Sequence, residues 1–284
     1  MKLVSFKHQD VASYGFVTGS GIVDCGRRLG AQYADLRAVL TQGGLSRMRD
    51  LAREAADYQT EEIEFLPVIP NPGKIIGIGG NYRGHLAEAN IEPPKYPMVF
   101  TRFNDGQVGS GQPILRPPES IQFDFEGELA FVIGTTARRV PVERALDYVA
   151  GYANYNDGSI RDWQFHTTQY TVGKSFAKSG AFGPWLVTTD EIPDPSALTL
   201  VSRLNGEEMQ HAPTSDLLFG VPELIGYLSI FTTLDPGDVV ITGTPSGVAI
   251  FRKPPPWLKQ GDVVEVEISG LGVLRNPVAD EMPA

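Results

Sequence analysis

The stretch Phe123–Gly134, with the sequence FDFEGELAFVIG, constrains the fold more than any other part of this chain. Side chains of a β-strand alternate between two faces, so Asp124, Glu126 and Glu128 share one face and the bulky apolar residues share the other. The acidic face continues in alanine and valine, as expected of a strand that runs from a polar edge into a core. An exposed strand face has a similar pattern, but like charges about 6–7 Å apart repel unless a positive partner lies among them. The pattern therefore predicts a strand whose acidic end requires a cation or another positive group.

Short apolar runs separated by glycine and proline turns fill most of the chain, which has 31 Gly and 22 Pro among its 284 residues. Near the N-terminus, residues 2–7, 15–18 and 21–25 are expected to form a small meander of strands. Apolar stripes at helical spacing then predict two short helices, over residues 36–40 and 45–55. These elements predict a small N-terminal α/β module.

A proline cluster at positions 67, 70 and 72 suits a domain boundary. We therefore expect an N-terminal domain over residues 1–69 and a larger domain over residues 70–284. The larger domain has few expected helices, and the motif Gly-Asp-Val-Val occurs twice, each copy opening one of two strands expected to be neighbours. The fold class predicted for it is α+β, dominated by sheet. Its expected helices are residues 83–90, 142–149, 159–170 and 221–230, and the repeated motif lies at 237–240 and 261–264.

The charge balance and cysteine content restrict the partners. Lys and Arg total 24 against 34 Asp and Glu, which gives a net charge of −10 and makes nucleic acid and anionic membranes poor partners. Cys25 is the only cysteine, so an internal disulfide and a multi-cysteine metal site are excluded. No apolar run approaches the length of about 20 residues that a membrane span needs. These observations predict a cytoplasmic protein.

A further acid, Asp157, lies in the sequence GYANYNDGSIRDWQ just before an expected helix start. By itself it is typical of a helix cap or a turn. Together with Glu126 and Glu128 it makes three oxygen ligands, which suit Mg²⁺, with Mn²⁺ or Ca²⁺ as substitutes, better than zinc. The three acids are therefore the predicted metal ligands.

The segment GIGGNYRGHLAEAN contains His85 and Glu88 at a spacing of three residues, which places them on one face of a helix. A carboxylate in this position orients an imidazole, or the two groups hold a water molecule together. The simpler interpretation is a solvated surface pair. A dinucleotide-binding loop is rejected because Tyr82 stands where the third glycine is needed and no βαβ unit follows.

These motifs, in their order, resemble the fumarylacetoacetate hydrolase family over about residues 70–280. The match consists of NY-x-x-H-x-x-E, D-F-E-x-E-L, ND-x-S-x-RD-x-Q, GKSF and TGTPSG. The resemblance implies a mixed β-sandwich roll with a variable N-terminal module, and a homodimer. It implies that Glu126, Glu128 and Asp157 bind the metal and that Asp124 plays a supporting role.

By the same resemblance, His85 and Glu88 form a water-activating pair on a lid, and Lys174 of GKSF is an active-site lysine. Gln164 and Thr244 are implied to line the substrate pocket, and Arg102 replaces a lysine often found there. Taken from the sequence alone, Lys174 is also typical of an exposed turn, TGTPSG of a simple turn, and Arg161 with Asp162 of a structural ion pair. A second departure from the family pattern is NDGSIRD, which carries Gly158 and Ile160.

The implied activity is Mg²⁺-dependent hydrolysis of a C–C bond in a small 2-oxo acid, an acylpyruvate or 2,4-dioxo acid, through an enolate. The alternative is an isomerase, tautomerase or decarboxylase of 2-oxo dioic acids, such as oxaloacetate or those of aromatic catabolism, at the same metal site. The presence of both His85 and Glu88 favours hydrolysis, because the alternatives need no attacking water. A rival from another class is a metal-binding module without catalytic activity.

Overall fold

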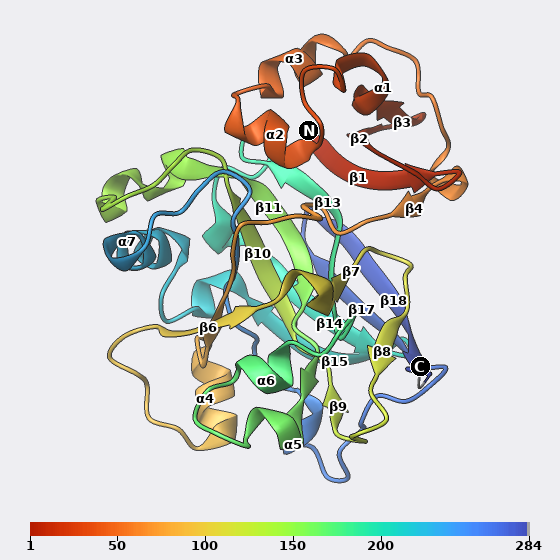
Figure 1. Ribbon diagram of the computed structural model, residues 1–284. Helices are drawn as coiled ribbons and strands as arrows, with labels where there is room; N and C mark the ends of the chain where they lie inside the picture. Colours follow the sequence, from red (N-terminus) through yellow and green to blue (C-terminus); the bar gives the residue numbers. More distant parts are fainter. Residues whose placement is uncertain (283–284) are drawn as a thin grey trace.

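Two sheets organise residues 1–282, which are the residues described by this computed structural model (Figure 1). The larger sheet has eleven strands in the order β3-β2-β1-β13-β11-β10-β16-β5-β6, with β4 beside β1 and β7 beside β13. Its strands are β1 (Lys2–His8), β2 (Val11–Thr18), β3 (Gly21–Asp24), β4 (Glu64–Phe65), β5 (Ile75–Gly79), β6 (Met98–Arg102), β7 (Gln107–Val108), β10 (Gly127–Ile133), β11 (Val149–Asn156), β13 (Gly180–Thr188) and β16 (Val239–Ile241).

The smaller sheet has five strands in the order β15-β14-β17-β18-β8, and β9 and β12 form a separate two-stranded ribbon. Most pairs are antiparallel, but β16 with β5, β13 with β7 and β18 with β8 are parallel. Mixed pairing of this kind fits the predicted sheet-dominated α+β class. The strands are β8 (Ile114–Arg116), β9 (Phe123–Asp124), β12 (Ser159–Ile160), β14 (Thr199–Leu204), β15 (Glu207–Pro213), β17 (Val263–Ile268) and β18 (Gly272–Asp280).

The helices are short except for the last one. The α-helices are α1 (Cys25–Leu29), α2 (Leu36–Thr41), α3 (Leu45–Asp50), α4 (Arg83–Ala89), α5 (Arg161–Gln164), α6 (Thr171–Lys174) and α7 (Val221–Phe231). The 3₁₀ helices are η1 (Thr60–Glu62), η2 (Asn104–Gly106), η3 (Val142–Tyr148), η4 (Pro195–Ala197), η5 (Thr214–Asp216) and η6 (Ala249–Phe251). The helices predicted over 83–90 and 221–230 are confirmed, whereas 142–149 forms a 3₁₀ helix. The prediction of a single helix over 159–170 is wrong. This region contains the short strand β12 and the helix α5, and the next helix, α6, begins only after residue 170.

Strand β10 separates two apolar cores, as its alternating sequence predicts. Ala130 and Val132 pack in the core that contains α2 and the N-terminal strands. Leu129 and Phe131 pack on the other side, in the core that contains α7 and the inner face of the smaller sheet. The strand therefore packs on both faces against large buried clusters, directly beyond its acidic end.

The N-terminal module is joined to the rest of the structure through the large sheet. Strand β1 pairs with β13, with Lys2 opposite Val187, so the sheet crosses the expected boundary near residue 70. Figure 1 shows the red and orange module at one end of the molecule and α4, α5 and α6 at the other end. The division into domains at residue 70 stays a prediction, but the two parts share one sheet.

The prediction that the two Gly-Asp-Val-Val copies open neighbouring strands is wrong. The first copy leads into β16, which lies between β10 and β5 in the large sheet. The second leads into β17, which lies between β14 and β18 in the small sheet. The same Gly-Asp turn therefore precedes two strands in different sheets. The turn sequence determines where a strand begins, whereas long-range packing determines which strand it pairs with.

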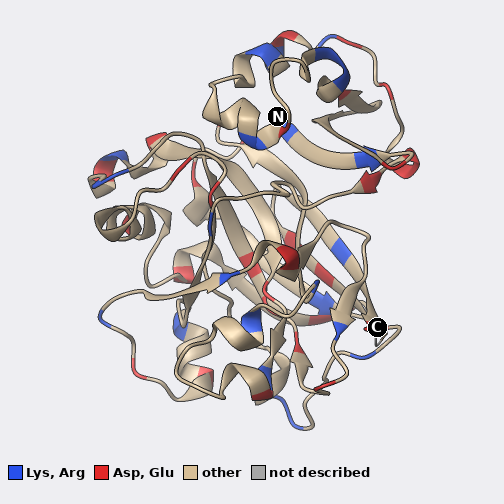
Figure 2. Cartoon of the chain, viewed as in Figure 1, with Lys and Arg blue, Asp and Glu red and all other residues tan. Residues whose placement is uncertain are grey.

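Acidic and basic residues are interspersed along the whole chain, including the N-terminal helices (Figure 2). Within residues 1–282, none of the helices has the length and apolarity that crossing a membrane requires.

Asn81 fixes the end of β5 just before α4 begins. Its buried side-chain amide donates to the carbonyl oxygens of Phe219 and Thr242, and its side-chain oxygen accepts from the Phe219 N–H, all at 2.8–3.0 Å. We expect Asn81→Ala to lower the free energy of unfolding by about 2–4 kcal/mol, because buried partners are left unsatisfied. Chemical denaturation measures this. Asn104→Ala, which removes one hydrogen bond at an exposed residue, is the control, and an equal loss in both variants would contradict the assignment.

Candidate metal centre and active site

Three buried carboxylates meet at the acidic end of β10. Glu126 lies between β9 and β10, Glu128 lies in β10, and Asp157 directly follows β11. The antiparallel pairing of Gly127 with Asn156 brings these positions together, and the Asp157 N–H donates to the Glu126 carbonyl oxygen at 2.8 Å. One oxygen from each carboxylate lies within 4.8 Å of the others. The structure thus brings together all three predicted metal ligands.

The turn after Asp157 is built around Gly158. A side chain there is excluded, because a Cβ atom would lie 1.9 Å from the Ser179 carbonyl oxygen. The chain therefore turns tightly and leaves the Asp157 side chain pointing into the acidic cluster, where it pairs with Arg102 and Lys174. The simpler interpretation of Asp157 as a helix cap is wrong.

Two buried cations face the acids across the site. The Nζ atom of Lys174 lies 2.6 Å from an oxygen of Glu126 and 2.6 Å from an oxygen of Asp157. Arg161 lies 2.6 Å from Glu126 and 2.8 Å from Asp124. The interpretation of Lys174 as part of an exposed turn is wrong, because Lys174 is almost completely buried. The interpretation of Arg161 and Asp162 as an ion pair is also wrong, because Arg161 pairs with Asp124 and Glu126.

Asp124 lies outside the metal cluster, in agreement with the supporting role that the resemblance implies. The prediction of one continuous strand over Phe123–Gly134 is wrong, because the strand is interrupted at residues 125–126 and Asp124 lies in β9, which belongs to the separate ribbon. The Asp124 carboxylate accepts from the Arg161 side chain and from the backbone N–H groups of Phe125, Ala249 and Ile250 at 2.8–3.1 Å. It therefore positions Arg161 and joins β9 to η6.

The charges around the cluster are unequal, with four buried acids against three buried cations. The acids are Asp124, Glu126, Glu128 and Asp157, and the cations are Arg102, Arg161 and Lys174. Within residues 1–282, Glu128 has no cationic side chain at ion-pair distance; it accepts a hydrogen bond of 2.7 Å from the Gly243 N–H. One negative charge therefore has no positive partner.

The pKa values follow this imbalance. Burial raises the pKa of the Glu128 carboxyl well above its usual range, and the neighbouring Asp157 and Glu126 carboxylates raise it further. Burial also opposes ionisation of Glu126, but the cations Lys174 and Arg161 overcome this effect and hold the pKa of Glu126 at about 2. Burial acts to lower the pKa of Lys174, yet Asp157 and Glu126 raise it. Glu128 is thus the carboxyl group of the cluster that lacks a compensating cation.

A divalent cation fits this arrangement. Three carboxylate oxygens form a set that contains neither nitrogen nor sulfur, and one of the acids has no ion-pair partner. Hard cations with oxygen ligands match such a set, and a bound cation would offset the negative charge of the three carboxylates. Glu126, Glu128 and Asp157 are therefore the residues that would hold the ion.

Arg102, predicted to contact substrate, lies behind the cluster. Its guanidinium is fully buried and donates to Asp157, to the carbonyl oxygens of Gly106 and Gly158, and to the Ser179 hydroxyl. It does not line the cavity described below. Arg102 therefore holds Asp157 in place, and its predicted contact with the substrate stays a prediction that its position outside the cavity lining does not support.

His85 and Glu88 lie on α4, as predicted, but no hydrogen bond joins them. The His85 Nδ1 atom is 3.6 Å from Glu88 Oε2, beyond hydrogen-bond distance, and within residues 1–282 it has no other partner. The Glu88 carboxylate accepts from the Gly247 N–H at 3.1–3.2 Å. His85 lines the cavity and Glu88 does not. Their predicted catalytic roles stay predictions, with His85 the better placed.

A cavity of about 90 Å³ opens beside the cluster and has two unlike walls. The polar wall contains the remaining predicted pocket residues, Gln164 and Thr244. The Thr244 hydroxyl donates to the Gly127 carbonyl oxygen and accepts from Gln210, so it is engaged in the fold. The polar wall is completed by His85, Glu126, Glu128, Arg161 and Lys174, and the apolar wall by Ile78, Leu86, Ala89, Ile91, Met98, Phe100, Phe165, Tyr170, Ile250 and Phe251.

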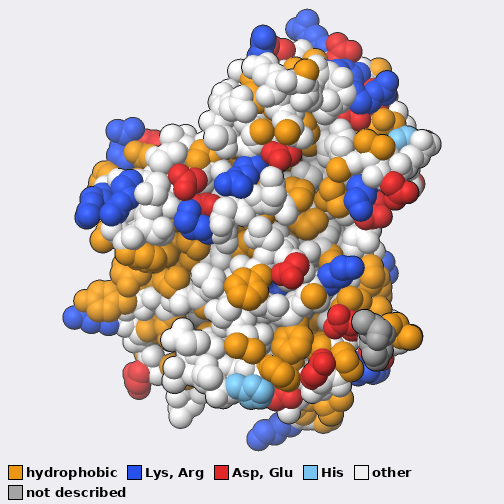
Figure 3. Space-filling view, viewed as in Figure 1, with side chains coloured by type: hydrophobic (Ala, Val, Ile, Leu, Met, Phe, Trp, Pro, Cys, Tyr) orange, Lys and Arg blue, Asp and Glu red, His pale blue; other side chains and the backbone are white. Residues whose placement is uncertain are grey.

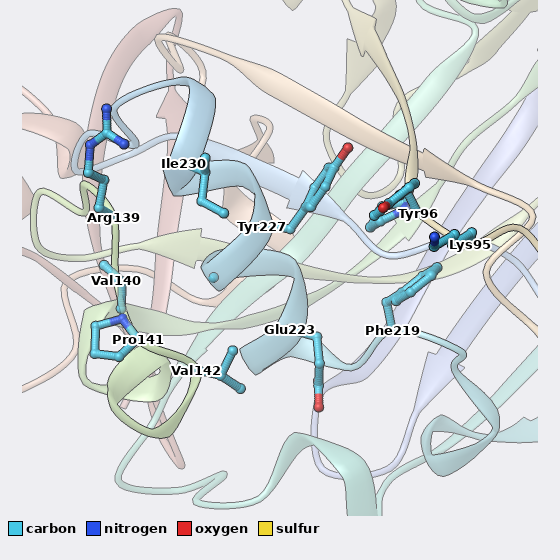
Figure 4. Close-up of a pocket in the computed structure, with 12 residues that line it drawn as sticks. Lys95, Tyr96, Arg139, Val140, Pro141, Val142, Phe219, Glu223, Tyr227 and Ile230 are labelled. Atoms are coloured by element: carbon cyan, nitrogen blue, oxygen red, sulfur yellow. The ribbon is translucent and has the colours of Figure 1, made fainter.

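A larger open groove of about 650 Å³ lies elsewhere, along α7. Figure 4 shows Tyr227 and Ile230 of α7 between Tyr96 on one side and the segment leading into η3 on the other. Hydrophobic side chains gather over α7 in the space-filling view (Figure 3). None of the predicted ligands or ionisable site residues lines this groove. The chemistry therefore belongs to the smaller cavity.

Sequence reasoning missed Arg161 as a site residue. Its Nη1 donates to the Gln164 side-chain oxygen, while its buried Nη2 has no partner within residues 1–282 and its side chain lines the cavity. The available signal was its place three residues before Gln164 in the same motif. The aromatic wall was missed as well, because Phe100, Tyr170 and Phe251 come from three distant segments.

Known proteins resemble this chain over nearly its whole length. The mitochondrial oxaloacetate tautomerase of Xenopus laevis is 40% identical over 98% of this chain and 90% of its own. The fold matches the fumarylacetoacetate hydrolase of Exiguobacterium antarcticum with a TM-score of 0.87 and 34% identity, covering 99% of this chain and 100% of that chain.

A maleylpyruvate hydrolase from Sphingobium sp. SYK-6, solved with a manganese(II) ion and pyruvate, matches with a TM-score of 0.82 and 27% identity over 99% of this chain and 100% of its own. Residues 74–279 match the profile of the fumarylacetoacetate (FAA) hydrolase C-terminal domain. This match covers the metal cluster, both cations, α4 and the cavity walls. The chain belongs to the fumarylacetoacetate hydrolase family.

Proposed function

We propose that this protein is a divalent-metal-dependent tautomerase that interconverts the enol and keto forms of a small 2-oxo acid, with oxaloacetate as the first substrate to test. The observation that carries the proposal is the polar wall of the cavity, where an imidazole faces two buried cations and the carboxylate cluster. The relatives named above, which include an oxaloacetate tautomerase, support this choice of reaction.

Arg161 and Gln164 suit the carboxylate of such a substrate. The Arg161 Nη2 atom is buried at the cavity without a hydrogen-bond partner in residues 1–282, so it is available to an anion. Its position is fixed by Asp124 and Glu126, and Gln164 accepts from the neighbouring Nη1 atom. A charge-assisted hydrogen bond from a guanidinium to a carboxylate is among the stronger polar contacts. It orients the 2-oxo acid with its third carbon toward the rest of the cavity.

His85 suits the proton transfer. Its imidazole lines the cavity, and imidazoles exchange protons near neutral pH. In the direction from enol to keto, protonated His85 delivers a proton to the third carbon of the substrate, the proton of the enol hydroxyl passes to solvent water, and His85 is then reprotonated from solvent. A divalent ion held by the three acids would supply positive charge that favours the enolate. The Lys174 ammonium adds fixed positive charge beside the same cluster.

Hydrolysis of an acylpyruvate C–C bond is the second candidate. Glu88 favours it, because a carboxylate 3.6 Å from His85 Nδ1 can support the imidazole when a water is deprotonated. Tautomerisation needs only the imidazole. We propose Mg²⁺ or Mn²⁺ as the ion, and a cytoplasmic homodimer as the form of the protein.

Ketonisation of oxaloacetate tests the proposal. The enol form is diluted from an aprotic solvent into buffer with enzyme and Mg²⁺, and its ultraviolet absorbance is followed while released pyruvate is measured in parallel. We expect enol decay faster than in buffer with Mg²⁺ alone, and no added pyruvate. Pyruvate release from an acylpyruvate without faster ketonisation would favour the hydrolase, and no acceleration of either reaction would refute both.

A further inference from the structure

The cavity walls differ in chemistry in a way that restricts the substrate. Beside its charged and polar side chains, the lining is aliphatic and aromatic. Phe100 connects the two walls, since its ring centroid lies 5.3 Å from Lys174 Nζ on one side and 6.2 Å from the Tyr170 ring on the other. An apolar surface therefore begins directly beside the polar end of the site.

Aromatic rings continue from there to the mouth of the cavity. Tyr170 meets Phe165 edge to face at 6.5 Å, and Phe251 meets His85 edge to face at 5.7 Å. Phe165 is 59% exposed, Ile91 51% and Phe251 38%, although all three line the cavity. Large apolar side chains exposed at a cavity mouth offer a contact surface for an apolar ligand group.

The cations of the cavity lie on its polar wall, where the Arg161 Nη2 atom is assigned to the first carboxylate of the substrate. Among the described residues that line the cavity, the Lys and Arg side chains are Lys174 and Arg161, and both pair with the acids of the polar wall. A second carboxylate at the apolar end would gain no positive partner there, and it would replace the apolar contact that an alkyl or aryl group makes with these side chains. The site therefore disfavours a dicarboxylic substrate whose far end reaches the mouth.

We propose that the preferred substrates are 2-oxo acids with an alkyl or aryl substituent on the third carbon, and that Phe165, Phe251 and Ile91 are the residues that select it. This inference rests on the proposed function, because it assumes that the 2-oxo acid end lies against the polar wall. Oxaloacetate, with its short second carboxylate, is then a tolerated substrate and a poorer one than phenylpyruvate.

Substituted oxamates test this preference without turnover. Oxamate mimics the 2-oxo acid end, and its N-propyl derivative and N-oxalylglycine add tails of similar length that differ in charge. We expect calorimetry with Mg²⁺ present to show N-propyl oxamate binding roughly tenfold tighter than oxamate, since each fully buried methylene contributes about fourfold. N-oxalylglycine is expected to bind no tighter than oxamate.

Variants at the mouth show which residues are responsible. Phe165→Ala should lower the affinity ratio of N-propyl oxamate to oxamate roughly threefold. Phe231→Ala is the matched control, because Phe231 has the same exposed fraction of 59% but does not line the cavity. Ile91→Lys should shift the preference toward N-oxalylglycine by adding a cation at the mouth.

The outcomes separate this inference from the proposed function. If both tailed compounds bind but N-oxalylglycine equals or exceeds N-propyl oxamate, the apolar selectivity is wrong and the tautomerase proposal stands. An unchanged ratio in Phe165→Ala, or the same fall in Phe231→Ala, also contradicts it. If the ratio behaves as expected but neither phenylpyruvate nor oxaloacetate is ketonised faster, the selectivity stands and the tautomerase proposal fails. Absence of binding by oxamate itself would overturn both.

Discussion

Glu128→Gln is expected to abolish divalent-metal binding while leaving the metal-free protein as stable as the wild type or more so. The carboxyl has a pKa raised well above its usual range by burial and by the Asp157 and Glu126 carboxylates. A group with a raised acidic pKa in the folded state makes the protein less stable as pH rises through and above the unfolded pKa. Glutamine removes this effect and still accepts the hydrogen bond from the Gly243 N–H.

Asp157→Asn provides the contrast, because Asp157 pairs with two buried cations, Arg102 and Lys174. Removing its charge leaves Arg102 and Lys174 buried without one of the negative charges that neutralise them. We expect this to lower the free energy of unfolding by about 3–5 kcal/mol. Both variants should lose Mg²⁺ binding in calorimetry, but only Asp157→Asn should unfold at markedly lower denaturant concentration without metal. Wild-type Mg²⁺ affinity in both variants would remove the metal-site assignment.

His85→Ala is expected to lower kcat/KM for ketonisation by roughly 10²–10⁴-fold, the effect of losing a positioned acid–base group. Oxalate and Mg²⁺ should bind nearly as in the wild type, because neither the carboxylate cluster nor Arg161 is changed. Stopped-flow kinetics and calorimetry together measure this separation of binding from chemistry.

Glu88→Gln is the matched control for His85→Ala. Its amide oxygen can still accept from the Gly247 N–H, so the fold of this segment is kept. If the reaction is tautomerisation, this variant should retain most of its activity, whereas hydrolysis would need both residues. Full ketonisation activity in His85→Ala would contradict the role given to the imidazole.

Local patterns predicted part of the candidate metal cluster, and the resemblance to the family completed it. Strict alternation in Phe123–Gly134 placed Glu126 and Glu128 on one side, and the same alternation divides β10 between two cores. Asp157 was added as a third oxygen ligand and by the resemblance of the motif order to the family, and the pairing of β10 with β11 in the structure brings it beside Glu126. These predictions depend on residue order and on the period of a strand, which a single sequence contains.

Contacts between distant segments could not be predicted in the same way. Arg102 and Arg161 are both arginines beside acids, yet one is enclosed behind Asp157 and the other lines the cavity, a difference set by how β6 and α5 pack. The two Gly-Asp-Val-Val strands entered different sheets for a similar reason. The apolar mouth of the cavity is formed by residues up to 160 positions apart, from Ile91 to Phe251. No local pattern in the sequence therefore indicates it.

Deuterium exchange at the third carbon of 2-oxobutanoate in D₂O tests most directly whether this cavity forms an enol of a 2-oxo acid with the help of the carboxylate cluster. Proton NMR would follow the loss of the C3 signal with Mg²⁺ present, for the wild type and for Glu128→Gln. The account predicts exchange well above that of buffer with Mg²⁺, stopped by a chelator and absent in the variant. Exchange in the wild type that is no faster than in Glu128→Gln would contradict it.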